Sequence, residues 1–553
     1  MMARPDMMVA AMAASAVSVF FACSSLTDAG GSEIGNPSQI TVMGSVVYGG
    51  SGTPVAGADV RIRSRTFCKD TTMAAFSKSA NLQKNTITDV FGRFTIDSVD
   101  TGDYLIEVND GKLNAAAISC AARGASRIKE LPAHAVLPTG TIRGSVIMDR
   151  PGGGVYVQMY GLDRVARADI STGEFVLREV PAGTYDLRIV SLSPAFSPVK
   201  VRQVSVASGA GTVIDTVRLV RFAGWKYSKR IVLNTSVSGA NVAGTVYGFP
   251  ALVRLSSLTF DFSEALPDGR DVRFAKADST PNSFEIERWD PVTLIAEVWV
   301  RVDTVKGSDS TQSMMMFWGN PDAERASNGG AVFGADNGFI GAWHLDTVCT
   351  DATDNHHDGT NFGADDVTGI IGSAKKFDGR DSIRIAGLLG QPAALTLSGW
   401  VMTDTTVPSG QDIVSLGDAV LIRADEVVGG YGTGGYAHQY TRNGDTAFLK
   451  VTSGVNVAKT GWRHIAFSFN NVTQAHSLYI DGVPVRVDNS VNAVDYAGVG
   501  VNTFIGAHGN GKLSYNNRGC IDEVRVCAVA RSGDWIRLCY MNQRLDDKFI
   551  IFK

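Results

Sequence analysis

The sequence predicts an all-β protein built from tandem sandwich domains. Its 553 residues exceed what one hydrophobic core can organise, since domains usually hold roughly 100 to 200 residues. Sixty glycines and many Val and Thr residues favour short strands and turns over helical bundles. In many short runs apolar residues recur at every second position, which is typical of strands with one face on a core and one in water.

Residues 1–22 predict an export signal. An apolar stretch follows Arg4 and ends at the small residue Ala22, directly before Cys23. The four residues from Phe20 to Cys23 resemble a bacterial lipoprotein box, which implies that Cys23 becomes the lipidated first residue. The alternative is an ordinary secretory signal cut near Ala22. We therefore expect an exported chain, lipid-anchored at the outer membrane or cell surface, with residues 23–38 as a flexible tether.

The net charge of the chain argues against one class of partner. A formal charge of -4, without Lys/Arg clusters interleaved with aromatic residues, gives no basic field that would gather phosphates. Nucleic acid is therefore not expected as a partner.

The cysteines predict disulfides, because an even number remains after Cys23 and the compartment is expected to be oxidising. Cys68 and Cys120 are alone in the N-terminal region, so we expect them to pair. The other four allow three pairings, which stay open: Cys349, Cys520, Cys527 and Cys539.

An internal repeat follows the tether. The run Gly44-Ser45-Val46-Val47 recurs as Gly144-Ser145-Val146-Ile147, and each copy leads to the same eight-residue pattern with identical spacings. The first pattern is Gly92, Phe94, Ile96, Val99, Gly102, Tyr104, Ile106 and Val108; the second is Gly173, Phe175, Leu177, Val180, Gly183, Tyr185, Leu187 and Ile189. We expect two small sandwiches, over residues 39–137 and 138–221. Both resemble the carboxypeptidase regulatory-like domain, which implies structural modules without a catalytic set.

Residues 222–333 form the next expected domain. Its strand-like runs are Gly224–Ile231, Phe249–Leu255, Asp271–Phe274, Phe284–Asp290, Ala296–Val300 and Met314–Pro321. Their order resembles the bacterial domain of unknown function numbered 2341, a β domain whose activity the resemblance does not specify. That module commonly precedes a laminin-G-like jelly roll.

Residues 334–553 form the last expected domain. Its runs are Trp343–Asp346, Leu397–Val401, Gly461–Phe469, Leu478–Gly482 and Gly519–Val526. This series resembles the laminin-G-like branch of the concanavalin A-like jelly rolls. Near its end Ser532 is expected to cap a short helix that places Trp535, Leu538 and Cys539 on one face and packs on the sandwich edge.

One candidate site is structural calcium at Asp522. Parity along its strand places Asp522 with Val524 and Val526 on the core side if Glu523 and Arg525 face water, and a buried carboxylate needs a partner. Jelly rolls that resemble this one often hold calcium between the last strand and the loop after the first, here residues 351–359. The expected ligands are Asp522, Asp354, His357 and Gly359. The alternative is that protein donors satisfy Asp522.

A second candidate is the glycine-rich loop from residue 429 to residue 440. Tyr431, Tyr436 and Tyr440 are candidate ligand-binding residues, since tyrosines at a sandwich rim can stack on sugar rings. The alternative is a plain connection between strands with Tyr436 and Tyr440 partly in the core.

Catalysis is not expected. Glycan hydrolysis needs two carboxylates beside a cleft, and the Glu-x-Asp-x-x-Glu strand of jelly-roll glycanases is absent. The acidic run Glu285–Asp290 lies in another domain. We expect non-catalytic binding or adhesion at the cell surface, to a polysaccharide or another surface protein. The alternative is a structural spacer without ligand, and a divergent glycan hydrolase comes third.

Overall fold

The computed structural model describes residues 39–69, 84–123, 127–149, 153–403, 409–426, 436–443, 447–489, 493–511 and 513–553. These residues are mostly in strands, which confirms the all-β prediction. The chain divides into two compact units, Met1–Arg65 with Ser79–Leu137 and Thr66–Lys78 with Pro138–Lys553. The export signal and Cys23 lie outside the described residues. No described helix is long and apolar enough to cross a membrane.

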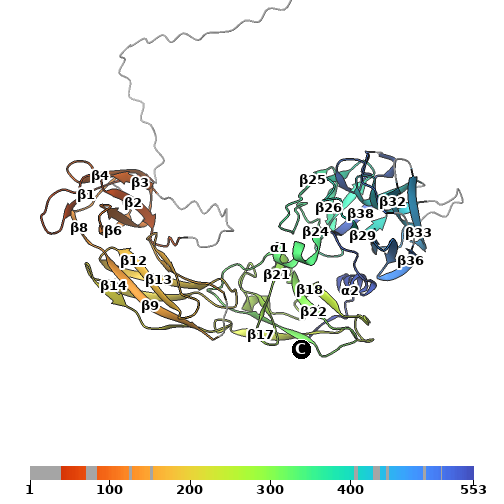
Figure 1. Cartoon of the computed structure of the whole chain (residues 1–553), viewed down its shortest axis with the longest axis horizontal. Coiled ribbons are helices and arrows are strands. Elements are labelled where there is room, and N and C mark those ends of the chain that lie inside the picture. The colour runs from red at the N-terminus through yellow and green to blue at the C-terminus, as the bar shows by residue number, and fades with distance from the viewer. Residues whose placement is uncertain are drawn as a thin grey trace, which may run out of the picture. The chain divides into compact units, whose positions relative to one another are not determined.

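The first unit is a small sandwich (Figure 1). Its described strands are β1 (Gln39–Tyr48), β2 (Asp59–Ser64), β3 (Lys84–Ile87), β4 (Arg93–Asp100), β5 (Gly102–Asn109), β6 (Asn114–Ala122), β7 (Ile128–Glu130) and β8 (His134–Pro138). They pair in the order β3-β2-β5-β6-β8-β1-β4, with β7 beside β1. Inward-facing Val, Ile, Phe and Tyr side chains of these strands make one core.

The second sandwich opens the second unit. Its strands are β9 (Gly140–Met148), β10 (Val155–Met159), β11 (Val165–Arg167), β12 (Glu174–Val180), β13 (Gly183–Ser191), β14 (Val199–Val206), β15 (Gly211–Val213) and β16 (Val217–Leu219). They form two sheets, β11-β10-β13-β14 and β12-β9-β15, and β16 pairs with β9.

The two copies of the sequence repeat match in register as well as in spacing. Gly44 pairs with Phe94 between β1 and β4, and Gly144 pairs with Phe175 between β9 and β12. Apart from the glycines, all residues of both patterns are buried. The equal spacings therefore correspond to equal positions in two cores.

The segment around Cys68 does not belong to the first sandwich. The carbonyl oxygen of Phe67 accepts a hydrogen bond from the Gly161 amide at 2.8 Å, and the described residues 66–69 group with the second unit. Cys68 is partly buried, Cys120 is buried, and both thiols are free in the structure. The expected disulfide between them is not formed there, and it stays a prediction.

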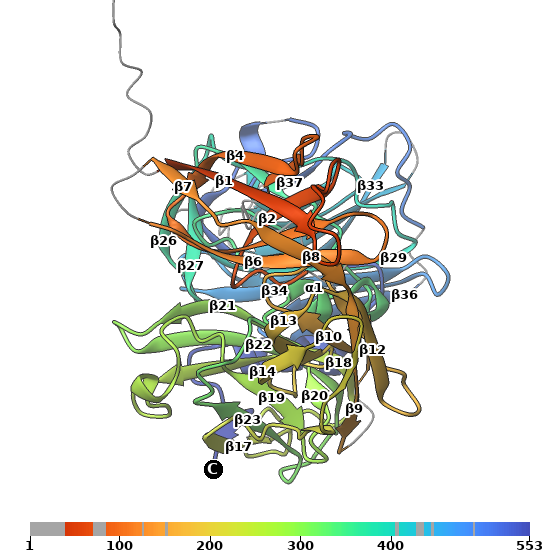
Figure 2. The same ribbon diagram turned by 90° about the vertical axis from the view of Figure 1, so that its left-hand side faces the viewer.

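The 222–333 region folds as two packed sheets. Its elements are β17 (Tyr227–Leu233), β18 (Val246–Ser256), η1 (Phe262–Glu264), β19 (Arg273–Lys276), β20 (Pro281–Asn282), β21 (Phe284–Asp290), β22 (Ile295–Val305), β23 (Ser313–Trp318) and α1 (Gly329–Val332). The sheet orders are β20-β19-β23-β17-β39 and β18-β22-β21. The last strand, β39 (Ile550–Phe552), comes from the C-terminus, which lies beside β17 in both views (Figures 1 and 2). The expected boundary at residue 334 therefore does not separate all the strands of the two domains.

The jelly roll consists of two facing sheets. Its elements are η2 (Ala335–Asn337), β24 (Phe339–Trp343), β25 (Gly359–Phe362), β26 (Asp365–Thr368), β27 (Ser373–Asp378), β28 (Ser382–Ile385), β29 (Ala394–Thr403), β30 (Ser409–Leu416), β31 (Val420–Glu426), β32 (Tyr436–Asn443), β33 (Ala447–Asn456), β34 (Arg463–Asn470), β35 (Ala475–Ile480), β36 (Val483–Asn489), β37 (Thr503–Ile505), η4 (Leu513–Tyr515) and β38 (Arg518–Cys527). One sheet runs β26-β27-β38-β29-β34-β35-β36 with β24 beside β38, and the other runs β25-β28-β37-β30-β31-β32-β33. An apolar core fills the space between them.

Helix α2 (Gly533–Gln543) connects the jelly roll to the preceding domain. As predicted, Ser532 caps it by accepting from the Trp535 amide at 3.2 Å, and Trp535, Leu538 and Cys539 are buried. The helix packs against β18 as well as β36 (Figure 1), so it lies between the domains and not only on the sandwich edge. One apolar core is therefore shared by the 222–333 region, α2 and the outer face of the β29 sheet.

This shared interface contains a carboxyl group that makes stability depend on pH. Asp547 accepts from the Phe549 amide at 2.7 Å, and burial raises its pKa to about 7. Because the folded state holds the proton more tightly than the unfolded state, stability is highest at acid pH and falls as pH rises toward 7. Between pH 5 and pH 7 we expect a loss of about 2 kcal/mol from this group. Urea unfolding at both pH values measures the loss, and Asp547→Asn should remove it; an unchanged pH dependence in that variant would contradict the assignment.

Candidate functional site

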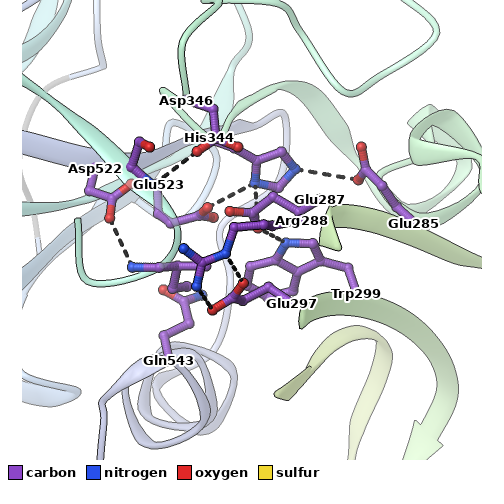
Figure 3. Close-up of polar contacts among 12 residues, drawn as sticks. Glu285, Glu287, Arg288, Glu297, Trp299, His344, Asp346, Asp522, Glu523 and Gln543 are labelled. Carbon is purple, nitrogen blue, oxygen red and sulfur yellow. Dashed lines mark hydrogen bonds and ion pairs between the residues drawn. The ribbon is translucent and has the colours of Figure 1, made fainter. Parts of the chain in front are cut away.

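A cluster of ionisable side chains is buried where the 222–333 region meets the jelly roll (Figure 3). Glu285 and Glu287 lie on β21, His344 follows β24, and Glu523 lies on β38. Both β21 carboxylates reach the same imidazole, although the strand pairing is irregular at Glu287 and more than fifty residues separate them from His344. The cluster therefore exists only because the two domains pack together.

The imidazole of His344 lies among three carboxylates. Its Nδ1 is 2.8 Å from Oε1 of Glu523 and 3.4 Å from Oε2 of Glu287. Its Nε2 is 3.3 Å from Oε2 of Glu285. The side chains of Glu287 and Glu523 are 1% exposed and that of His344 is 11% exposed, so water screens these charges little.

Neighbouring donors hold the carboxylates in place. Trp299 donates its indole N–H to Oε2 of Glu287 at 2.6 Å, and Arg525 donates to Oε2 of Glu523 at 2.7 Å. The Arg525 guanidinium lies over the Trp299 ring, 4.2 Å from its centroid. Beside them Arg288 and Glu297 form a two-pronged ion pair with distances of 2.6 and 2.8 Å.

The burial and the mutual charges shift the pKa values in opposite directions. Burial raises the pKa of Glu287 well above its usual range, and the neighbouring Glu523 charge adds to this. Burial by itself lowers the pKa of His344, but the surrounding carboxylates outweigh it and raise that pKa well above 6.5. The pKa of Glu523 is lowered despite burial, because His344 and Arg525 stabilise its charge. These opposite shifts favour a cationic imidazole beside an ionised Glu523.

The position of Asp522 differs from the expected one. Ile521, Val524 and Val526 belong to the sandwich core, whereas Asp522 pairs across the sheet with Trp400 of the shared core. A bulge opposite Gly399, with Glu523 at a φ of 51°, breaks the alternation between residues 522 and 524. Asp522 therefore does not share the core side with Val524 and Val526, and that prediction is wrong.

The expectation that Glu523 and Arg525 face water is also wrong. The two residues are 2% and 4% exposed, because the 222–333 region covers the outer face of β38. The sandwich therefore has no solvated outer face at this strand.

Backbone donors satisfy one oxygen of Asp522. Its Oδ2 accepts from the amides of Ile370 and Ile371 at 2.8 and 3.1 Å, and its Oδ1 is buried without a hydrogen-bond partner. Burial raises the pKa of Asp522 well above its usual range. For Oδ2, protein donors therefore supply the partners, as in the alternative to calcium that the sequence left open.

The loop 351–359 is organised by its own first residue. The carboxylate of Asp351 accepts from the amides of Ala342, Thr353 and His357, each at 3.0 Å. His357 places its Nδ1 3.0 Å from the carbonyl oxygen of Ile340, and Gly359 begins β25. Asp354 is exposed.

The expected calcium ligands are not brought together as a group. Within the part of the chain that the structure describes, the His, Cys, Asp and Glu side chains that converge as three possible metal ligands are Glu287, His344 and Glu523. Asp522, Asp354 and His357 are not among them. Calcium binding at these positions stays a prediction.

The predicted tyrosines fall on the other sheet of the jelly roll. Tyr431 lies outside the described residues. Tyr436 and Tyr440 are on β32 and not in a loop; they pair with Glu426 and Leu421 of β31.

A second polar group lies on the same sheet. Asp412 of β30 is 2.5 Å from Nε of Arg423 and 2.6 Å from Nδ1 of His508, all three residues being buried. Arg423 lies over the ring of partly buried Tyr515, 3.8 Å from its centroid. Arg423 is also the cross-strand neighbour of His438, so this group borders the strand of the predicted tyrosines.

Sequence reasoning missed Glu285, Glu287 and His344 as members of a site. The local patterns place Glu285 and Glu287 only in a strand of the β domain, and His344 only in a strand of the jelly roll. Two carboxylates two residues apart share one face of a strand, which is the one local signal that could have identified them.

Two regions of the chain match known families. Residues 377–537 match the concanavalin A-like lectin/glucanases superfamily, and residues 268–346 match the domain of unknown function DUF2341. Both matches confirm the expected assignments of these regions. No curated protein matches the chain.

Several solved structures are similar to part of the chain. Domain 4 of AbnA, a GH43 extracellular arabinanase from Geobacillus stearothermophilus, in complex with arabinotriose, shares 20% identity over 36% of this chain and 96% of that one, with a TM-score of 0.30. The binding domain of Paraclostridial Mosquitocidal Protein 1 shares 13% identity over 37% and 52%, with a TM-score of 0.31. A pentraxin from Limulus polyphemus shares 13% identity over 29% and 82%, with a TM-score of 0.23.

Proposed function

We propose that this chain is a non-catalytic binding or adhesion protein of the cell surface that recognises a polysaccharide or another surface protein through its jelly roll. The observation that carries the proposal is the match of residues 377–537 to a superfamily of lectins and glucanases. The Glu-x-Asp-x-x-Glu strand of the glycanases is missing from the sequence, which favours binding over hydrolysis.

The proposed binding face is the surface around Tyr515 of η4, beside strands β30 and β31, whose own described side chains are buried. Asp412, Arg423 and His508 form a buried brace that holds the loop carrying Tyr515 against β30 and β31. A partly exposed aromatic ring on a fixed loop can stack on a sugar ring or a partner side chain at low entropic cost. Tyr436 and Tyr440 lie on strand β32, which pairs with β31, and stay candidate ligand-binding residues in our proposal.

The remainder of the chain would present this face. In our proposal Cys23 carries the lipid anchor, and the two small sandwiches act as carboxypeptidase regulatory-like spacers. A lipid chain contributes about 0.8 kcal/mol per buried CH₂, and one chain by itself gives only reversible membrane binding. Stable anchoring through Cys23 therefore needs more than one acyl chain.

The test uses the full chain expressed from residue 24, because α2 and β39 pack on the 222–333 region and a fragment 334–553 would expose the shared core. Saturable retention on a polysaccharide or surface-protein array is expected. Tyr515→Ala should weaken it roughly tenfold, the usual effect of truncating an aromatic anchor. Tyr247→Ala, a 66% exposed tyrosine of β18, is the control and should bind like wild type. Retention on no array would favour the spacer alternative, and equal loss in both variants would place the site elsewhere.

A further inference from the structure

We propose that Glu287, His344 and Glu523 bind one divalent first-row transition-metal ion, such as Zn²⁺, that joins the 222–333 region to the jelly roll. One carboxylate comes from β21, the imidazole follows β24, and the second carboxylate comes from β38. One ligand atom of each lies within 4.8 Å of the other two. The site is independent of the proposed binding face on the opposite sheet.

The distances fit ligands of a common ion. Metal bonds to imidazole nitrogen and carboxylate oxygen are about 2.0 to 2.2 Å long, so two atoms bound to the same ion lie roughly 3 Å apart. Nδ1 of His344 is 2.8 Å from an oxygen of Glu523 and 3.4 Å from an oxygen of Glu287. An ion could therefore be accommodated with small movements of the side chains.

The hydrogen bonds of the cluster leave a buried carboxylate oxygen without a donor. Nδ1 can carry one hydrogen, yet it faces two carboxylates, and only Glu523 is within good hydrogen-bond distance. Oε1 of Glu287 is buried and has no hydrogen-bond partner. A buried carboxylate oxygen without a partner is costly, and a cation bound by both oxygens of Glu287 would remove that cost.

Each proposed ligand also has an outer partner of the kind that orients metal ligands. Nε2 of His344 faces Glu285, whose carboxylate can accept a hydrogen bond from Nε2–H when Nδ1 binds metal. Arg525 holds Glu523, and Trp299 holds Glu287. The carboxylate–histidine arrangement fixes the tautomer that leaves Nδ1 free as a ligand.

The donor set selects the kind of ion. Calcium takes six to eight oxygen ligands, whereas one imidazole with two carboxylates suits Zn²⁺, Mn²⁺ or Fe²⁺. The ion would replace the proton on Nδ1 and balance the negative charge that Arg525 neutralises only in part. The competing possibility is that protons alone neutralise the cluster.

The test measures metal content and thermal unfolding of the full chain from residue 24. After incubation with Zn²⁺ and removal of unbound ion, elemental analysis should find about one ion per chain. The Tm of the unit containing the cluster should rise by about 5 °C with Zn²⁺ relative to chelator. Cobalt should give a visible absorption band that Zn²⁺ displaces.

Three variants distinguish the proposed metal ligands from the residue that orients one of them. Glu287→Gln and Glu523→Gln should each abolish stoichiometric metal and the Tm difference, and Glu285→Gln should weaken binding 10- to 100-fold. Asp547→Asn, which removes another buried carboxyl of the same interface, should retain the metal. A wild-type chain that folds, holds no stoichiometric metal and unfolds at the same Tm in Zn²⁺ and chelator would overturn the proposal in favour of protons. Loss of metal in Asp547→Asn as well would also overturn it.

Discussion

Gly92→Ala is expected to destabilise the first unit by about 3 to 4 kcal/mol. Gly92 has a φ of 70°, which costs a side-chain-bearing residue about 1 kcal/mol. An added Cβ would also lie closer than 3.0 Å to the carbonyl oxygen of Val46. The Val46 amide in turn donates a hydrogen bond to the Gly92 carbonyl oxygen. The β1 strand cannot move away without breaking that bond, so steric strain adds to backbone strain.

Gly111→Ala is the matched control for this experiment. Gly111 lies in the same unit with a φ of 71°, but an added Cβ would meet nothing within 4 Å. It should cost only about 1 kcal/mol in urea unfolding. Gly173→Ala should reproduce the large effect in the second sandwich, where the added Cβ meets the Val146 carbonyl oxygen. Equal effects of Gly92→Ala and Gly111→Ala would show that close approach to β1 does not matter.

Asn542→Ala is expected to destabilise the shared core by about 3 kcal/mol. The Asn542 side chain is fully buried at the end of α2; it accepts from the Leu252 amide at 2.7 Å and donates to the Leu252 carbonyl at 2.9 Å. Truncation leaves both backbone groups of the β18 residue without a partner in an apolar environment. Each unpaired buried group costs about 1 to 3 kcal/mol.

Asp546→Ala provides the comparison in the same segment. Its carboxylate pairs with Arg544 but is 70% exposed, so its loss should change stability by less than about 1 kcal/mol. Equilibrium urea unfolding of the full chain measures both variants. A small effect of Asn542→Ala would mean that water reaches the Leu252 backbone and that the α2 contact with β18 is weak.

The small sandwiches could be predicted from the sequence almost residue by residue. The spacing from Gly92 to Val108 contains the turn, the strands and the inward positions, all of which follow from local alternation. The cap at Ser532 was predictable for the same reason, since a capping residue acts on an amide three residues away.

The cluster around His344 could not be predicted in this way. Its members come from β21, the end of β24 and β38, and nothing in their local patterns indicates that these strands meet. The contribution of β39 to the sheet of the 222–333 region is equally non-local, because it pairs with a strand more than three hundred residues away.

By itself the sequence determined the all-β class, the repeated sandwiches, the two matched families and the capped C-terminal helix, because each depends on periodicity or contacts over a few residues. Only the tertiary structure decided which way the β38 side chains face. A single bulge at Glu523 shifts the alternation, and the neighbouring domain buries the face that would otherwise be in water. Period-two reasoning assumes an unbroken ladder and one solvated side, and domain packing removed both conditions, which placed Asp522, Glu523 and Arg525 together in a buried polar interface.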